Sequence, residues 1–334
     1  MILHNGLVFK KKVVNFAFRF INGLNHRFRP SKSCPIPTNP RKILLSNLGN
    51  IGDLLIASKT IASLKLAYPN AEWGVLVSSR GQSGVRGQFQ RIHVYDHWCL
   101  SKCKAALHSR RKAIREIRDE QYDMGIDLQP FYPNAVPLMR SAKIPVRMGY
   151  ASGGFGAALT HPFDWKDFGT YLGDLHLDHL RQVGIYVQTV PPIKSSQSKD
   201  YIVVHMCSSR TEKDWKRERW IELIRKLHPR TIVLTGLGAK DAVECEAVAQ
   251  ATGCKNLCNQ TSLEEYRSLL QQAKGLISVD SMGVHLAALL HVPRFVLFSE
   301  TESLPLWLPP GSHVALLRED PVEKIVDFVH TQCR

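Results

Sequence analysis

The chain has 334 residues, of which 44% are hydrophobic and 22% are charged, enough for two globular domains with separate cores. Its formal net charge is +15, and residues 1–42 contain nine Lys or Arg and no acid. No apolar run reaches the ~18–20 residues that span a bilayer, so a transmembrane class is excluded. The cysteines are scattered and complete no zinc-type pattern, so we expect no metal centre and a reducing, cytoplasmic compartment.

Residues 1–40 are predicted to form a basic amphipathic arm. Read as a helix, the segment carries one apolar face, whose members are Phe9, Val13, Phe16, Ala17, Phe20, Ile21 and Leu24. Basic residues such as Lys10, Lys11 and Arg19 lie elsewhere around it, a pattern typical of helices in the interface of an anionic membrane. The alternatives are a disordered basic arm and a helix packed on its own domain. We expect no nucleic-acid partner, because no RNA-binding motif is present.

After Pro40 the chain alternates between strand and helix patterns. In the first half, strands are predicted at 42–47, 72–78, 91–96, 124–129 and 146–150, with helices at 52–68, 101–121, 133–142 and 170–187. The segment 151–165 is rich in glycine and is predicted to be a mobile loop. This alternation predicts a first domain over residues 41–187.

A second alternation follows a short polar segment. Residues 188–200 hold two prolines and three serines, which indicates a linker. Strands are then predicted at 201–206, 231–236, 255–258, 275–280, 294–299 and 313–318, with helices at 217–228, 240–251, 262–273, 283–291 and 321–331. Strands that alternate with helices form parallel sheets covered on both faces, so residues 201–334 are predicted to be a second α/β domain.

Two segments, 42–58 and 276–299, share one pattern. Each is an apolar strand, a turn that contains glycine, and a helix whose first turn carries Asp or Ser. Such a turn places free backbone N–H groups at the carboxyl edge of a sheet, where open α/β sheets bind anionic ligands. Two such edges predict two sheets that face each other across a cleft.

Four motifs carry a resemblance to a known family. They are 46-SNLGNIGDLLIASKTIASLKLAYPNAEWGVLVSS-79, 203-VVHMCSSRTEKDWKRERWIELI-224, 231-TIVLTGLGAKDAVECEAVA-249 and 278-SVDSMGVHLAALLHVPRFVLFSETE-302. In this order and spacing they resemble glycosyltransferase family 9, the bacterial heptosyltransferases, over about residues 42–330.

The resemblance implies a GT-B fold, with two Rossmann-like parallel-sheet domains that face a central cleft. The N-terminal domain would bind the acceptor and the C-terminal domain the nucleotide sugar. The implied reaction is an inverting transfer of heptose from ADP-heptose to a lipopolysaccharide inner-core acceptor, with no cofactor. No DxD-like acidic pair stands out as a metal site, so we expect the reaction to be independent of metal. We expect a cytoplasmic monomer, peripheral on the inner face of the cytoplasmic membrane through the basic arm.

The resemblance also implies roles for individual residues. Asp53 would be the catalytic base, although a first-turn Asp can also merely complement the helix dipole. Lys213 would bind phosphate, or else be an ordinary surface lysine. Ser208 and Ser209 match the hydroxyl pair that binds phosphate oxygens, and Asp241 falls where the family keeps an acid for the ribose, or caps its helix.

The last motif would hold the diphosphate and the sugar. Asp280, Ser281 and the backbone at Met282 and Gly283 match the strand-to-helix turn that receives the diphosphate. His285 follows on the same helix and would contact the diphosphate or sugar. Thr261, with Gln260, lies nearest to the expected adenine-side loop.

The chain departs from the family pattern at this turn. The family has D-(S/T)-G-x-x-H, whereas this chain has D-S-M-G-V-H, with Met282 in place of glycine. The family's G-P-T-D is S-E-T-E here, and a usual histidine is replaced near Tyr171. Two alternatives therefore stay open: a transferase that uses another nucleotide sugar, and a catalytically weakened, membrane-associated binding protein.

Overall fold

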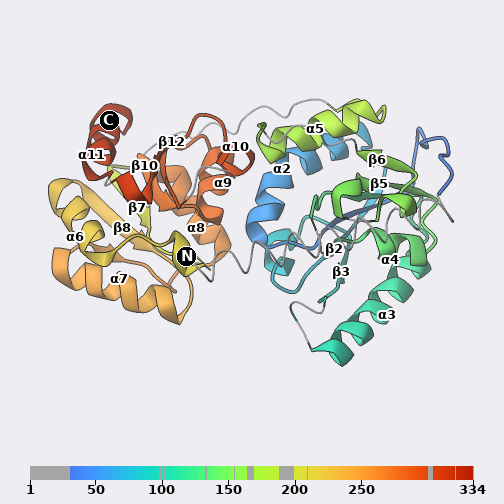
Figure 1. The fold of residues 1–334 in the computed structure, drawn as a ribbon, viewed down its shortest axis with the longest axis horizontal. Helices are drawn as coiled ribbons and strands as arrows, with labels where there is room; N and C mark the ends of the chain where they lie inside the picture. The colour runs from blue at the N-terminus through green and yellow to red at the C-terminus, as the bar shows by residue number, and fades with distance from the viewer. Residues whose placement is uncertain are drawn as a thin grey trace. The chain divides into compact units, whose positions relative to one another are not determined.

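A computed structural model gives the fold of the chain as two compact units, which are described separately (Figure 1). The first unit is Met1–Phe168 with Gly173–Val190, and the second is Gly169–Leu172 with Pro191–Arg334. The residues that the structure describes are 31–97, 100, 102–131, 134–153, 155–163, 169–187, 199–208, 210–299, 304–319 and 321–333.

The first unit is built on a parallel sheet of six strands. They are β1 (Lys42–Asn47), β2 (Glu72–Val77), β3 (Arg91–Val94), β4 (Met124–Asp127), β5 (Val146–Tyr150) and β6 (His161–Phe163). The order across the sheet is β3-β2-β1-β4-β5-β6, so the direction of winding reverses between β1 and β4. In open α/β sheets, ligands bind at the carboxyl ends of the strands beside such a reversal.

Helices cover both faces of this sheet (Figure 1). They are α2 (Ile51–Ala67), α3 (Cys103–Glu120), α4 (Val136–Ser141) and α5 (Leu172–Gln182). Leu54 and Leu64 of α2 share one core with Leu180 of α5, while Ile117 of α3 and Met139 of α4 belong to the core on the other face. Each fully buried side chain of this size contributes about 1.5–3 kcal/mol, so these apolar stripes fix the helices to the sheet.

The segment 151–165, predicted to be a loop, contains regular structure that the prediction missed. Two short 3-10 turns, Ala151–Gly153 and Gly156–Ala158, are followed by β6, which pairs in parallel with β5. The backbone N–H of Thr160 donates to Arg147 O at 2.9 Å. Strand pairing therefore holds part of this glycine-rich segment.

The end of the predicted arm lies on the first unit. Ser31 N donates to Ala157 O at 2.9 Å, and Arg147 Nη2 donates to Ser31 Oγ at 2.9 Å. Cys34 and Ile36 pack against the core that α2 and α5 cover. The rest of the predicted arm, residues 1–30, lies outside the described residues.

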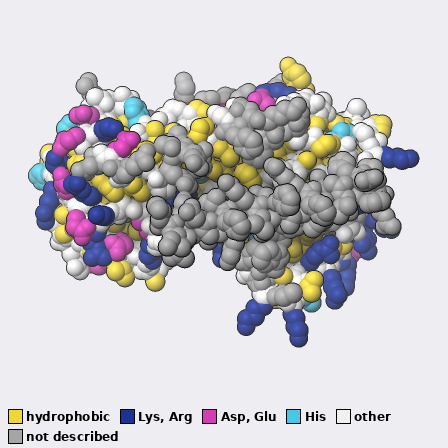
Figure 2. All heavy atoms as spheres, in the orientation of Figure 1, with side chains coloured by type: hydrophobic (Ala, Val, Ile, Leu, Met, Phe, Trp, Pro, Cys, Tyr) yellow, Lys and Arg dark blue, Asp and Glu magenta, His cyan; other side chains and the backbone are white. Residues whose placement is uncertain are grey.

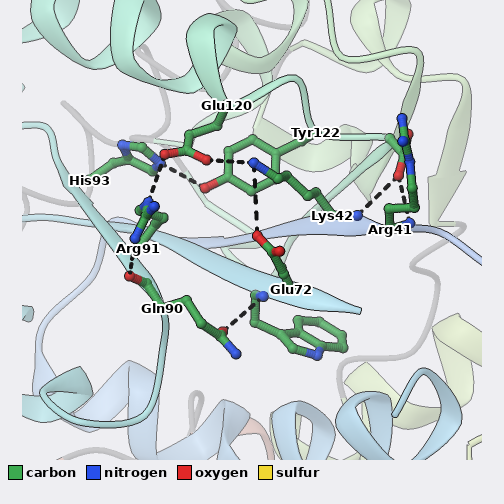
Figure 3. A network of polar contacts seen from close by, with 10 residues as sticks. Arg41, Lys42, Glu72, Gln90, Arg91, His93, Glu120 and Tyr122 are labelled. Atoms are coloured by element: carbon green, nitrogen blue, oxygen red, sulfur yellow. Dashed lines mark hydrogen bonds and ion pairs between the residues drawn. The ribbon is translucent and has the colours of Figure 1, made fainter. Parts of the chain in front are cut away.

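A polar network joins the amino ends of the strands to the end of α3 (Figure 3). Glu120 accepts hydrogen bonds from Lys42 Nζ at 2.9 Å and from Arg91 Nε at 2.8 Å. His93 Nε2 and Tyr122 Oη are 2.8 Å apart. Because ligands bind at the opposite, carboxyl edge of such sheets, we interpret this network as part of the fold.

The second unit repeats the same topology. Its strands are β7 (Tyr201–His205), β8 (Thr231–Thr235), β9 (Lys255–Asn256), β10 (Gly275–Val279), β11 (Arg294–Phe298) and β12 (His313–Leu316). Their order is β12-β11-β10-β7-β8-β9, all parallel, so the winding reverses between β7 and β10. The two Rossmann-like parallel sheets predicted from the sequence are thus confirmed.

The helices of the second unit are α6 (Arg217–Lys226), α7 (Ala239–Thr252), α8 (Leu263–Gln272), α9 (Met282–Leu289), α10 (Leu304–Trp307) and α11 (Val322–Gln332). Trp220 of α6, Val248 of α7 and Phe328 of α11 share one core. Val284 of α9 belongs to a smaller cluster with Phe298 of β11. Within the described part of the chain, no helix is both long enough and apolar enough to cross a membrane.

Candidate functional site

Asp53 lies at the carboxyl end of β1, in the first turn of α2. Its Oδ2 accepts a hydrogen bond from Asn50 N at 2.8 Å, which caps the helix. A side chain at Gly49 would place its Cβ 2.4 Å from Asp53 Oδ2, so only glycine lets the loop approach this carboxylate. Asn47 Oδ1 and Ser78 Oγ fix the backbone of Gly49 by hydrogen bonds of 2.9 and 3.0 Å. Asp53 therefore caps α2, and the catalytic role of this half-buried carboxylate stays a prediction.

A buried carboxyl follows the neighbouring strand β4. Asp127 is fully buried and accepts hydrogen bonds from Ser46 Oγ at 2.8 Å, Ala135 N at 3.0 Å and Gln129 N at 3.3 Å. Burial raises the pKa of Asp127 to about 7, although these hydrogen bonds oppose the shift. Beside it, Gln129 Oε1 and both side-chain polar atoms of Asn134 are buried, and no described residue forms a hydrogen bond with them. Unpaired amides in this position are able to bind hydroxyl groups of a ligand.

In the second unit, three predicted residues come together where the winding reverses. Lys213 follows β7 and forms an ion pair with Asp280, which follows β10. His285 lies one turn into α9 and is 5% exposed. The charges of Lys213 and Asp280 both act on its imidazole. Burial lowers the pKa of His285 to about 4, with the Asp280 carboxylate opposing the shift and Lys213 adding to it. The imidazole is therefore neutral near pH 7 and carries one donor and one acceptor nitrogen.

Tyr171 contacts this histidine from the short segment that belongs to the second unit. Tyr171 Oη lies 3.2 Å from His285 Nδ1, and the two rings are stacked with centroids 6.2 Å apart. A hydrogen bond at Nδ1 restricts the orientation of the ring and leaves Nε2 for another partner. The sequence marked Tyr171 only as a departure from the family pattern.

The loop after β7 carries Ser208 and Lys213. Ser208 Oγ donates to Arg210 O at 2.8 Å, and Ser208 N donates to Asp214 Oδ1 at 2.9 Å. Lys240, at the start of α7, forms an ion pair with Asp214 and donates to Ser208 O at 3.1 Å. The loop that presents Lys213 is thus fastened to α7 by a lysine that the sequence analysis did not select.

The first turn of α9 contains Ser281, Met282 and Gly283. Ser281 is the N-cap residue, and its Oγ lies 3.0 Å from Ser278 Oγ. The first N–H groups of a helix have no partner within the helix, so this turn is suited to binding an anion. Tyr266 of α8 reaches the same turn, because a Cβ added at Gly283 would lie 2.4 Å from Tyr266 Oη.

The remaining predicted residues lie around this edge. Asp241 is 8% exposed, and its Oδ2 accepts a hydrogen bond from Leu237 N at 2.9 Å, so it fastens the turn before α7. Thr261 lies half-buried in the turn before α8, and none of the described hydrogen bonds joins it to Lys213. Ser209 lies outside the described residues.

Sequence reasoning missed Lys240, Tyr266 and Asn134. Lys240 adjoins the selected Asp241, so its place in the same turn was a signal that went unused. Tyr266 occupies an apolar position of α8, and nothing in the local pattern distinguishes it from a core residue. Among the residues that the structure describes, no group of three or more His, Cys, Asp or Glu could hold a metal ion.

Comparison with known proteins points to one family. The sequence model of glycosyltransferase family 9 (heptosyltransferase) matches residues 176–317. The lipopolysaccharide heptosyltransferase 3 of Escherichia coli is 24% identical over 288 residues, which cover 77% of this chain and 83% of that protein.

Solved structures give the same result for the fold. The Escherichia coli heptosyltransferase WaaC, solved with ADP, superposes with a TM-score of 0.72 at 18% identity, covering 87% of this chain and 99% of that one. WaaC solved with ADP-2-deoxy-2-fluoro heptose gives 0.70 at 19% identity, covering 86% and 99%. The two parallel sheets are those of the GT-B fold. The chain therefore matches the model of glycosyltransferase family 9 (heptosyltransferase) over residues 176–317 and is a glycosyltransferase.

Proposed function

We propose that this protein transfers heptose from ADP-heptose, with inversion, to an acceptor of the lipopolysaccharide inner core. The observation that carries the proposal is the grouping of Lys213, Asp280 and His285 at the N-terminus of α9, inside the segment that matches the family. The relatives are named for heptosyl transfer to lipopolysaccharide, and WaaC was solved with ADP and with an ADP-heptose analogue.

In this proposal, Asp53 takes the proton of the acceptor hydroxyl as its oxygen attacks the anomeric carbon. The bond between that carbon and the diphosphate oxygen breaks, and ADP leaves with the bonding electrons. Lys213 and the N–H groups that begin α9 stabilise the negative charge on the diphosphate. His285, neutral near pH 7, donates or accepts a single hydrogen bond rather than supplying a charge.

We assign the acceptor to the first unit and the nucleotide sugar to the second. The unpaired amides of Gln129 and Asn134 support the first assignment, because sugar hydroxyls form hydrogen bonds with amide groups. The ion pair between Lys213 and Asp280 supports the second, since it places the cation beside the anion-binding turn of α9. Neither assignment requires a cofactor.

Transfer by the Asp53→Asn variant tests the mechanism. Asparagine keeps an oxygen that can accept from Asn50 N, so the helix cap survives while the base is lost. With ADP-heptose and a heptose-deficient lipopolysaccharide, we expect kcat to fall ~10²–10⁴-fold and ADP binding to stay unchanged. Asp123→Asn, at the amino end of the first sheet, is the matched control and should transfer normally. Near-normal turnover in Asp53→Asn would remove this residue from the base role.

Met282 supports a second candidate, a transferase for a different nucleotide sugar. The residue stands where the family pattern has glycine, at the turn proposed to hold the diphosphate. Thermal unfolding with ADP, UDP and GDP separates the candidates, because a ligand at 100 times its Kd stabilises by about 2.7 kcal/mol. Stabilisation by ADP alone supports ADP-heptose, stabilisation by UDP or GDP supports the alternative, and no stabilisation supports a weakened binding protein.

A further inference from the structure

Tyr266 extends from α8 across the carboxyl edge of the second sheet. Its ring lies 5.9 Å from the ring of His205, the last residue of β7. Its hydroxyl lies near Thr235, the last residue of β8. The side chain therefore crosses the strand ends beside the place where the winding of the sheet reverses.

The hydroxyl ends at the first turn of α9. A Cβ at position 283 would lie 2.4 Å from Tyr266 Oη and 3.5 Å from its Cζ. Gly283 is buried within a regular helix, so glycine is required there for space rather than for backbone conformation. The glycine that the family has at position 282 is absent, and the glycine at position 283 makes room for this hydroxyl.

This hydroxyl is buried without a hydrogen bond. Tyr266 is 5% exposed, and among the residues that the structure describes none forms a hydrogen bond with its Oη. Burial raises the pKa of the phenol, and the Thr235 hydroxyl opposes that shift without completing a hydrogen bond. The group is thus a protonated donor, and an unsatisfied buried donor destabilises a folded protein unless a ligand satisfies it.

We propose that the Tyr266 hydroxyl donates a hydrogen bond to the terminal phosphate of the bound nucleoside diphosphate, beside the N–H groups that begin α9. The inference rests on the proposed function and adds a binding residue to it. Two independent observations support it: the anion-binding N-terminus of α9, and a buried donor without a partner that points into this turn. The contact compensates for the loss of the glycine that the family pattern has at position 282, where this chain has Met282.

Tyr266→Phe should keep or raise the stability of the free protein but weaken its binding of nucleoside diphosphate. Without ligand, the variant should unfold at or above the wild-type temperature, because an unsatisfied hydroxyl is removed from the interior. Its affinity for ADP, by calorimetry, should fall about tenfold, and its affinity for AMP should change little.

Tyr201→Phe is the matched control. Tyr201 Oη donates to Leu269 O at 2.6 Å, so this hydroxyl is satisfied within the same unit. Its removal should lower the unfolding temperature and leave ADP affinity unchanged. A purely structural role for Tyr266 would give the pattern of this control.

A second pair of variants tests the placement of the hydroxyl. Gly283→Ala should destabilise the protein, because the new Cβ would clash with Tyr266 Oη. In the Tyr266→Phe background, Gly283→Ala should lower the free energy of unfolding much less. The nearest ring carbon, Cζ, would lie 3.5 Å from the new Cβ. If Gly283→Ala lowers the free energy of unfolding equally in both backgrounds, the hydroxyl does not occupy this turn.

The outcomes separate the inference from the proposed function. If wild-type protein binds ADP and Tyr266→Phe binds it equally well, the inference is overturned and the proposed function stands. Equal losses for ADP and AMP also overturn it, because the contact would not be to the terminal phosphate. If the wild type binds no nucleoside diphosphate, the proposed function fails and the inference fails with it.

Discussion

The pKa of Asp127 reflects how deeply its carboxyl is buried at the carboxyl edge of the first sheet. Its carboxyl receives three hydrogen bonds, from Ser46, Gln129 and Ala135, yet complete burial still raises its pKa to about 7. The loss of hydration therefore outweighs the hydrogen bonds in setting its protonation. The folded protein holds a proton here at pH values where the unfolded chain, with its ordinary value of 3.8, has lost it.

This shift predicts a pH dependence of stability. Because the pKa of Asp127 is higher in the folded than in the unfolded state, the protonated carboxyl adds to the free energy of unfolding. This contribution is fully present below about pH 4. It is lost as the pH rises towards 7, by at most ~1.4 kcal/mol for each pH unit. In urea unfolding, the free-energy difference between wild type and Asp127→Asn should therefore decrease from pH 4 to 7 and then level off.

Ser46→Ala provides the control for Asp127. It removes a hydrogen bond that lowers the pKa of Asp127 and adds no ionisable group. The decrease in stability should then extend to higher pH than in the wild type. A difference between wild type and Asp127→Asn that is independent of pH would contradict the raised pKa.

At the scale of elements, the loop after β7 and the start of α7 act together. Asp214 accepts from Ser208 N and pairs with Lys240, which also donates to Ser208 O. The side chains of Lys240 and Asp214 are 40% and 18% exposed, so the pair is only partly screened by solvent. Because Lys213 lies in the same loop, the pair positions the cation proposed to bind phosphate.

Lys240→Met should therefore loosen the loop with little effect on overall stability. A partly exposed pair is worth about 0.2–1 kcal/mol, so ADP affinity should fall about two- to fivefold and amide hydrogen exchange should increase at 206–216. Lys240→Arg should restore most of the affinity. Lys226→Met, which breaks a pair with Glu323 on the far side of α6, should leave both measurements unchanged. Unaltered exchange in Lys240→Met would remove the positioning role.

The sequence predicted the elements better than the contacts between them. The bounds of β1 and β5 agree with the predicted 42–47 and 146–150, because turn residues interrupt the apolar pattern there. The short β6 was missed, because its pairing with β5 depends on contacts that a glycine-rich sequence does not reveal. At the site, Lys213 and Asp280 were both predicted to lie at the diphosphate, and the structure brings the two side chains together. The position of Tyr266 beside Gly283 depends on helix packing, which local periodicity does not determine.

At the scale of the whole molecule, the excess of positive charge suggests an anionic surface as partner. Residues 1–30 of the predicted membrane arm lie outside the described residues, so its role stays a proposal. Basic side chains also stand out over α3 in Figure 2, and the exposed ones are Lys102, Lys104, Arg111, Lys112, Arg115 and Arg118. Both segments would be attracted to anionic lipids, with a strength that falls as salt rises.

Deletion of residues 1–30 tests the arm. The cut should stop before Ser31, because this residue, Cys34 and Ile36 contact the first unit, and a deletion to residue 38 would remove those contacts. The deletion removes six Lys or Arg, each worth about 1 kcal/mol near an anionic surface. Sedimentation with vesicles that contain phosphatidylserine should show weaker binding and an unchanged unfolding temperature. Binding unaffected by the deletion would assign the attraction to α3 instead.

The short segment Gly169–Leu172 affects where the chain can be cut to separate its two units or to build chimeras of two relatives. It belongs to the second unit although its neighbours on both sides belong to the first, and it carries the hydroxyl that meets His285. No single cut in the chain therefore separates the two units with their residues complete. A chimera joined within 188–200 would pair His285 with a residue from the other parent, whereas a junction upstream of Gly169 keeps tyrosine and histidine from the same one.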